Sequence, residues 1–137
     1  MLTLLSDSED RTLSFVTYAQ DPVFNALDHA LLSSLGITVL AHPDAFERVT
    51  SNTLLFCPGA ERKHLELVLP YNPCFLFGGP LESSESEIIQ GFVGRSRSQA
   101  LVPFVAQEHA FWMTRLYFLA EEEMEREKAD GKDEERK

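Results

Sequence analysis

The chain has 137 residues, of which 44% are apolar and 10% aromatic, and it carries a formal net charge of -10. This composition excludes wholesale disorder and predicts one globular domain with a substantial core. Residues 121–137 hold nine acidic and five basic residues, a net of -4, which leaves -6 for the rest. Neither part forms a basic patch, so we expect no binding to nucleic acid.

The cysteines and the N-terminus restrict the protein class further. Cys57 and Cys74 lie in apolar runs without CxxC spacing, which favours free buried thiols over a zinc or redox site. The opening segment "MLTLLSDSEDR" lacks the basic start and long apolar run of a signal peptide. No eighteen apolar residues run together, so we expect a soluble cytoplasmic or nuclear protein that does not contact a membrane.

The segment from Leu13 to Leu40 spells a strand, a helix and a second strand. Leu13 to Tyr18 is rich in β-branched and aromatic residues, and Gly36 ends the helix before the next apolar run. Asp21 and Pro22 are placed as an N-cap and first helical residue. Within the helix, one apolar stripe is expected to face the core, formed by Phe24, Leu27, Leu31 and Leu35.

Four apolar segments recur along the chain, at Leu13 to Tyr18, Ile37 to Ala41, Thr53 to Cys57 and Cys74 to Gly78. Several run apolar on consecutive residues, as strands do when helices cover both faces of a parallel sheet. A short helix in "PDAFERV" and a longer one from Glu61 to Leu69 would connect the later strands. We therefore predict an α/β fold with an open, mainly parallel, Rossmann-like sheet and helices on both faces.

The pattern after Gly79 is less regular. "SEIIQGFVG" is typical of a short interrupted helix, and Pro103 makes "ALVPFVA" an edge strand or an extended connection. From Gln107 the spacing predicts a long C-terminal helix that docks on the sheet through Phe111, Trp112, Leu116 and Leu119. Residues 1–120 are then one α/β domain and 121–137 a charged tail, helical or disordered, that frays near Gly131.

Ligands of open α/β sheets bind beyond the carboxyl ends of the strands. Those ends read "QDP", "HPD", "CPG" and "GGP", which gives a candidate ligand-binding set of Asp21, His42, Asp44, Gly59, Gly78 and Gly79. Each has a structural alternative: Asp21 as a helix cap, His42 and the glycines as turn residues, and the nearby Cys57 as a small core residue. No GxGxxG, P-loop, GxSxG or HExxH occurs, so we expect no catalytic residue, cofactor or metal.

The segments "YAQDPVFNALDHALLSSLGITVL", "NTLLFCPGAERKHLELVL" and "CFLFGG" resemble the Sensitivity-to-Red-Light-Reduced family, also described as the SRR-like domain. The resemblance rests on the "DPVF" elbow at Asp21 to Phe24, on the Leu35–Gly36 pair and on the strand "TLLFCP". It covers Leu13 to Gly79, with a continuation to Phe118. It implies regulation in circadian and light signalling, or cytoskeletal or haem-related regulation in other lineages.

The chain also departs from the family pattern. The family has histidine and cysteine where this chain has Gly59 and Ala60, and asparagine and serine where it has Gly79 and Pro80. Family domains begin one strand and one glycine turn earlier, so the resemblance predicts an N-terminally truncated domain in which "MLTLLSD" is the end of a lost helix. A missing central strand would leave an exposed sheet edge that favours self-association.

Two functions remain open at this point. The first is a non-catalytic regulatory or interaction protein with protein partners still to be identified. The alternative is a cryptic or degenerate Rossmann-like enzyme that binds a nucleoside cofactor through Asp21 and the glycines of the strand ends. Whether the protein is an enzyme is left open, although no catalytic group is evident.

Overall fold

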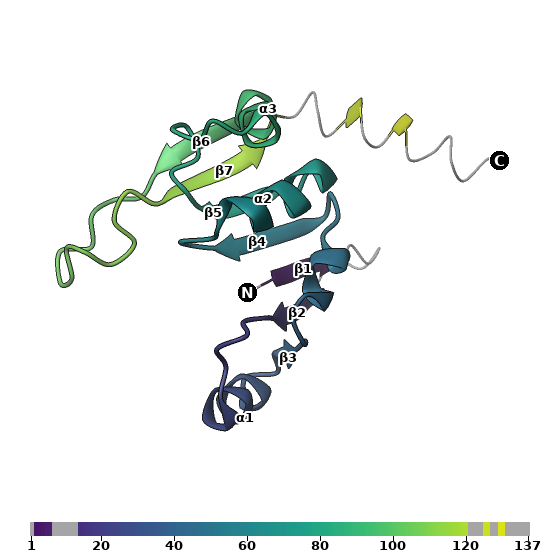
Figure 1. Ribbon diagram of the computed structural model, residues 1–137, viewed down its shortest axis with the longest axis vertical. Coiled ribbons are helices and arrows are strands. Elements are labelled where there is room, and N and C mark those ends of the chain that lie inside the picture. The colour runs from purple at the N-terminus through teal and green to yellow at the C-terminus, as the bar shows by residue number, and fades with distance from the viewer. Residues whose placement is uncertain (1, 7–13, 121–124, 127–128, 131–137) are drawn as a thin grey trace.

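The computed structural model describes residues 2–6, 14–120, 125–126 and 129–130. Its strands are β1 (Leu2–Ser6), β2 (Ser14–Ala19), β3 (Thr38–Val39), β4 (Thr53–Cys57), β5 (Phe75–Gly78), β6 (Ser96–Ala100) and β7 (Arg115–Leu119). Its helices are α1 (Ala26–Ser34), α2 (Arg62–Val68) and α3 (Glu87–Arg95), with short 3-10 helices η1 (Asp44–Arg48) and η2 (Leu69–Tyr71). The described part is a mixed α/β fold (Figure 1).

The described strands form one sheet in the order β3-β2-β1-β4-β5-β7-β6. Within this sheet, the strand order 3-2-1-4-5 is the order found in doubly wound sheets. The expected predominance of parallel pairing is nevertheless wrong, because only β2–β3 and β4–β5 are parallel among the described pairings. The pairs β1–β2, β1–β4, β5–β7 and β6–β7 are antiparallel.

The N-terminal segment is a strand and not the end of a lost helix. β1 lies between β2 and β4 and pairs with both, with Leu4 opposite Val16 on one side and Thr53 on the other. Seven residues separate β1 from β2 along the chain, too few for the crossover that a parallel neighbour requires. The central position of the sheet is therefore filled, and the edge expected there is paired.

One face of the central strands carries the core. Leu55 of β4, Leu76 of β5 and Tyr117 of β7 are buried there beneath α2 and α3, which contribute Leu65 and Phe92. Figure 1 shows α2 in front of β4 and β5. The prediction of a helix from Glu61 to Leu69 is thus confirmed by α2, which buries its inner face against the sheet.

The opposite face of the same strands is lined by half-buried apolar side chains. The strand registers place Leu54 beside Phe75 and Phe75 beside Phe118, and in the next row Phe56 beside Phe77. The rings stack in pairs, with centroids 4.8 Å apart for Phe56 and Phe77 and 6.4 Å for Phe75 and Phe118. The consecutive apolar residues of these strands thus alternate between a buried face and a half-buried face of the sheet.

Helix α1 starts later than predicted and does not bury the expected stripe. Its N-cap is Asn25, whose side chain accepts hydrogen bonds from two backbone N–H groups, while Asp28 accepts one from Asn25 in return. Leu27 and Leu31 are 78% and 59% exposed, and no α1 residue is buried. The helix contacts β3 at the end of the sheet (Figure 1).

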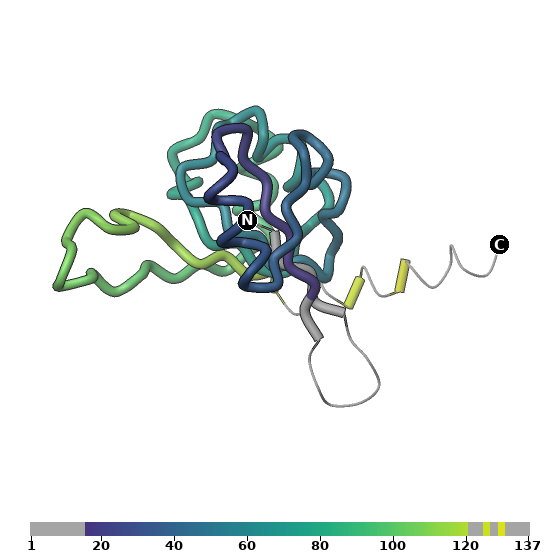
Figure 2. Tube along the Cα trace, turned by 90° about the horizontal axis from the view of Figure 1, so that it is seen from below, coloured from purple at the N-terminus to yellow at the C-terminus, as the bar shows by residue number. Residues whose placement is uncertain are grey.

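The predicted docked helix after Gln107 is also wrong. Residues 101–114 form an extended segment with turns, and Arg115–Leu119 is strand β7. Tyr117 and Leu119 are buried on alternate positions, the period of a strand. The connection 101–114 projects away from the rest of the chain (Figure 2). The predicted tail helix falls mostly outside the described residues.

Two smaller features complete the fold. α3 is a continuous helix despite Gly91 and Gly94, and its N-cap Ser86 accepts a hydrogen bond from Ile89. Pro103 lies in the extended connection, the second of the two alternatives for that segment. Among the described residues, no helix is both long and apolar enough to cross a membrane.

Candidate functional site

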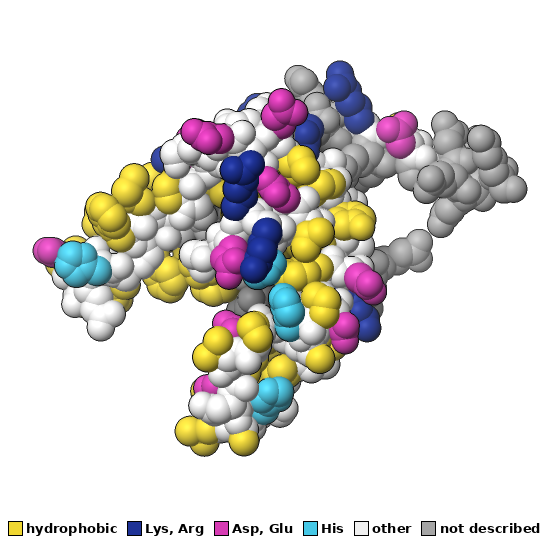
Figure 3. Space-filling view, viewed as in Figure 1, with side chains coloured by type: hydrophobic (Ala, Val, Ile, Leu, Met, Phe, Trp, Pro, Cys, Tyr) yellow, Lys and Arg dark blue, Asp and Glu magenta, His cyan; other side chains and the backbone are white. Residues whose placement is uncertain are grey.

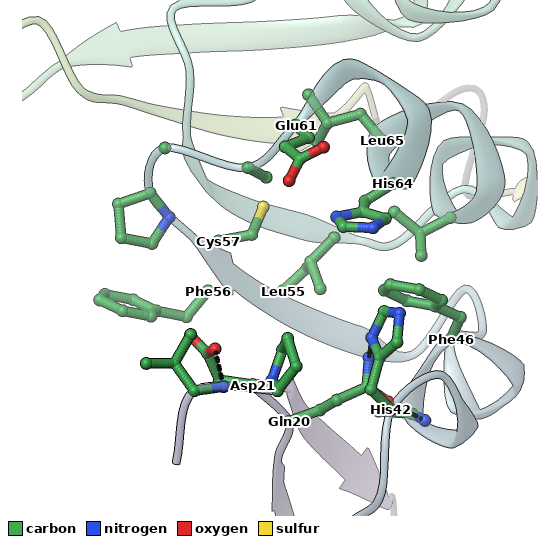
Figure 4. A pocket seen from close by; sticks show the side chains of 17 residues that line it. Gln20, Asp21, His42, Phe46, Leu55, Phe56, Cys57, Glu61, His64 and Leu65 are labelled. Atoms are coloured by element: carbon green, nitrogen blue, oxygen red, sulfur yellow. Dashed lines mark hydrogen bonds between the residues drawn. The ribbon is translucent and has the colours of Figure 1, made fainter.

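A cavity of about 470 Å³ opens at the ends of β2 and β4. Figure 4 shows its two sides: Glu61, the N-cap of α2, and His64, on α2, lie on the side of Cys57, and His42, Phe46 and Gln20 lie across from them. Of the candidate residues from the sequence, Asp21, His42 and Gly59 line this cavity, and Cys57 does too.

The remaining three candidates lie elsewhere. Asp44 starts η1, is exposed, and is absent from the cavity wall. Gly78 and Gly79 lie at the end of β5, where a Cβ on Gly78 would be 2.9 Å from the carbonyl oxygen of Cys57. A Cβ on Gly79 would be 2.9 Å from the hydroxyl of Tyr117. Close packing is therefore enough to account for both of these glycines.

Gln20 organises the floor of the cavity. Its Oε1 accepts a hydrogen bond of 2.6 Å from the backbone N–H of Ala45, which is buried in η1. That contact orients the amide so that Nε2, 3.3 Å away, donates to Nδ1 of His42. The Gln20 side chain thus connects the ring of His42 at the cavity wall to the backbone of η1.

Three rings gather beside that amide. His42 lies edge-on to Phe46, with centroids 5.4 Å apart, and 5.6 Å from His64. Phe46 and His64 are 5.1 Å apart and tilted by 36°. Their faces and edges form an aromatic wall of the kind that accepts a flat ring. We call His42, Phe46 and His64 the ring cluster.

Asp21 lies at the opening as part of a turn and not as a helix cap. Its Oδ1 accepts a 2.9 Å hydrogen bond from Val23 N–H, and its carbonyl accepts one from Phe24 N–H. Gly59 follows β4 with a φ of +69°, a conformation that favours glycine. A carboxylate and a loop backbone thus face the cavity from the ends of β2 and β4, which lie on either side of β1.

The surroundings of Glu61 and Cys57 in the cavity wall shift the pKa of each side chain. Lys63, whose Nζ is 3.0 Å from Glu61, lowers the pKa of the Glu61 carboxyl, and the charges of His64 and His42 lower it further. Burial raises the pKa of the Cys57 thiol to about 12. Cys57 is therefore a neutral thiol at physiological pH, which disfavours it as a nucleophile.

The described residues contain no group of three or more histidine, cysteine, aspartate or glutamate side chains placed to hold a metal ion.

Four residues of the cavity wall were not among the sequence candidates, namely Gln20, Phe46, Glu61 and His64. Glu61 and His64 could have been found, since they are the N-cap and a first-turn residue of the helix that follows β4. Phe46 has no such signal, because only the turn after β3 carries it to the cavity.

The arrangement defines a mixed α/β domain with a cavity at the strand ends. The model of the SRR1 domain matches residues 2–118, so the chain belongs to the SRR1 family. No curated protein and no solved structure matches the chain. The match begins in β1 and ends in β7, and thus includes all seven described strands.

Proposed function

We propose that this SRR1-family protein is a non-catalytic regulatory domain that responds to a small, flat ligand held in the cavity of β2 and β4. The observation that carries the proposal is the ring cluster facing a cavity whose polar groups are already engaged. Gln20 is bonded to Ala45, Asp21 to Val23, and Glu61 to Lys63. Groups that are held in this way orient a ligand more readily than they attack one.

In this proposal the SRR1-family protein exerts its regulatory role by binding protein partners. The resemblance implies circadian, cytoskeletal or haem-related regulation for the family, and we extend that expectation to this chain. A cytoplasmic or nuclear location is part of the same proposal.

Thermal unfolding in the presence of S-adenosylmethionine, NAD, NADP and haem tests ligand binding. A ligand of the native state raises the melting temperature by mass action, and the increase grows with its concentration. Phe46→Ala should abolish the increase by removing one ring of the cluster. Asp44→Asn is the matched control, because Asp44 lies in η1 like Phe46 but does not line the cavity. Absence of any shift at millimolar ligand would contradict the proposal.

A second candidate is a nucleoside-cofactor enzyme, favoured by the position of Asp21. It ends the strand next to the central one, and in doubly wound sheets an acidic residue near this place holds the ribose hydroxyls. Turnover of a common nucleotide or methyl donor that is lost in Asp21→Ala would favour this candidate. Binding without turnover would favour the regulatory one.

A further inference from the structure

The connection between β6 and β7, residues 101–114, is an apolar arm that projects from the domain (Figure 2). Trp112 is 73% exposed and Val105 is 91% exposed. Further large apolar side chains on the arm are at least half exposed, namely Val102, Phe104, Phe111 and Met113. Figure 3 shows apolar side chains along this projection and an acidic and a histidine side chain near its tip. Such a surface is unusual on a monomer and marks an interaction site.

The arm has a defined conformation. Phe111 lies edge-on to Phe77 with centroids 5.3 Å apart, which anchors the arm to the aromatic face of the sheet. Turn hydrogen bonds of 3.0 Å join Gln107 to Phe104 and Ala110 to Gln107. Phe111 and Met113 have φ values of +55° and +58°, a left-handed conformation uncommon for residues with side chains. This backbone places Trp112 between them and exposes its side chain.

The same arm carries a hollow. A cavity of about 440 Å³ is lined by arm residues, including Leu101, Phe104 and Trp112 itself, together with Phe77 of β5. For comparison, an apolar cavity of roughly 150 Å³ already admits benzene. The arm therefore presents an exposed aromatic side chain and an apolar hollow on one surface.

We propose that the arm is a self-association surface, in which the arms of two copies pack against each other and the exposed Trp112 of each copy, which forms part of the wall of the hollow, packs against the same wall of the second copy. In a two-fold symmetric interface the same patch of both copies meets, and the exposed apolar side chains of the arm form such a patch. The proposal is independent of the ligand cavity, which the arm residues do not line. It also differs from association through an unpaired central edge, since β1 fills that position.

Area and charge favour a second copy as the occupant. With about 200 Å² for each aromatic side chain, the exposed fractions of Phe104, Phe111 and Trp112 present on the order of 350 Å². The exposed aliphatic residues of the arm bring this toward the roughly 800 Å² that each partner buries in a stable interface. Glu108 is the only Asp, Glu, Lys or Arg in residues 101–114, so two arms meet with little repulsion. An anionic membrane, by contrast, would repel a chain with a net charge of -10.

Sedimentation analysis and tryptophan fluorescence of the full chain over a wide concentration range test the proposal. Trp112 is the only tryptophan, so its emission reports on this site alone. We expect a monomer–dimer equilibrium accompanied by a blue shift and by weaker acrylamide quenching as the concentration rises. Trp112→Ser and, separately, Val105→Ser should weaken dimerisation by about ten-fold or more.

Leu31→Ser is the matched control, because Leu31 is an exposed leucine on α1, outside the arm, and should leave the dimer unchanged. Val105→Ser retains the tryptophan, so the loss of its blue shift would confirm the site without any change in the fluorophore. A chain that stays monomeric at all concentrations overturns the proposal, and so does a dimer that both arm variants leave intact. Binding of the monomer to lipid vesicles through Trp112 also overturns it.

Discussion

Gly79 illustrates how the identity of single residues is set by packing in this protein. Its φ is +79°, and an added Cβ would be 2.9 Å from the Tyr117 hydroxyl. That hydroxyl is committed, since it accepts a 2.9 Å hydrogen bond from Leu81 N–H and donates one of 2.8 Å to Glu82. The packing of Gly79 against this hydrogen-bonded hydroxyl is therefore enough to require glycine at this position.

Cys57 gives a prediction at the same scale. Because burial raises the pKa of its thiol from its ordinary value to about 12, the folded protein at pH 8 should hold on the order of a thousand-fold less thiolate at this position than an unfolded chain. In a Cys74→Ala background, alkylation by iodoacetamide should be correspondingly slow. Addition of denaturant should restore the rate of a free thiol. Rapid alkylation of the folded protein at pH 8 would show that Cys57 is an activated thiol.

Gln20 gives a second prediction, on stability. Gln20→Ala removes the acceptor of the buried N–H of Ala45, and an unpaired buried donor costs about 1–3 kcal/mol. Urea unfolding should show a loss of that size in the free energy of unfolding. Gln99→Ala, on the exposed strand β6, serves as the control and should be nearly neutral. Equal losses in both variants would mean that the contact with Ala45 does not stabilise the fold.

At the scale of elements, α1 is held by its cap more than by its packing. Asn25 and Asp28 exchange backbone hydrogen bonds across the first turn, whereas the apolar side chains of the helix remain exposed. Helices of this length are marginal without tertiary contacts. We therefore expect α1 to open separately from the core.

Asn25→Ala tests this expectation. Loss of an N-cap of this type costs about 1 kcal/mol, and the cost should fall on the helix alone. Hydrogen exchange of the α1 amides should become several-fold faster, while the unfolding midpoint of the core should hardly change. A fall of the global midpoint comparable to that of a core variant such as Phe92→Ala would show that α1 folds together with the sheet.

The sequence indicated some elements well and others poorly, for physical reasons. Thr53–Cys57 and α2 were predicted because the run of apolar residues in the strand and the apolar face of the helix are each visible within a short stretch of sequence. β7 was mistaken for a helix because Leu116 and Leu119 are three residues apart, a spacing that also fits a helix, while Tyr117 carries the strand alternation. In the cavity, Asp21, His42 and Gly59 follow strand ends and were therefore found. Gln20 also follows a strand end, but its place in the site shows only in its hydrogen bonds to Ala45 and His42, which are distant in the sequence.

For the whole molecule, the order of the strands along the sheet, more than their parallel or antiparallel direction, is what this chain shares with doubly wound sheets. The chain keeps the doubly wound sequence β3-β2-β1-β4-β5 with an antiparallel strand in the middle. The carboxyl ends of β2 and β4 still point the same way, because both are antiparallel to β1. This common direction lets Asp21 and Gly59 face one cavity although β1 separates their strands.

A proline in β1 tests the importance of the central strand. Thr3 lies opposite Thr17 of β2 and Leu54 of β4, and proline removes the N–H that a central strand donates. Thr3→Pro should destabilise the fold by on the order of 3 kcal/mol in urea unfolding, compared with Thr3→Ala as the control. A Thr3→Pro variant as stable as Thr3→Ala would show that the pairing of β1 is dispensable.

The place of β1 also bears on the time course of synthesis. Its residues leave the ribosome before those of both partner strands, and one partner, Thr53–Leu55, follows about fifty residues later. The middle of the sheet can therefore close only after both β2 and β4 have been made, and this closure spans a long loop. Until then the strand offers one open side to any extended segment nearby, and a chaperone acting on this protein would have to shield it during that interval.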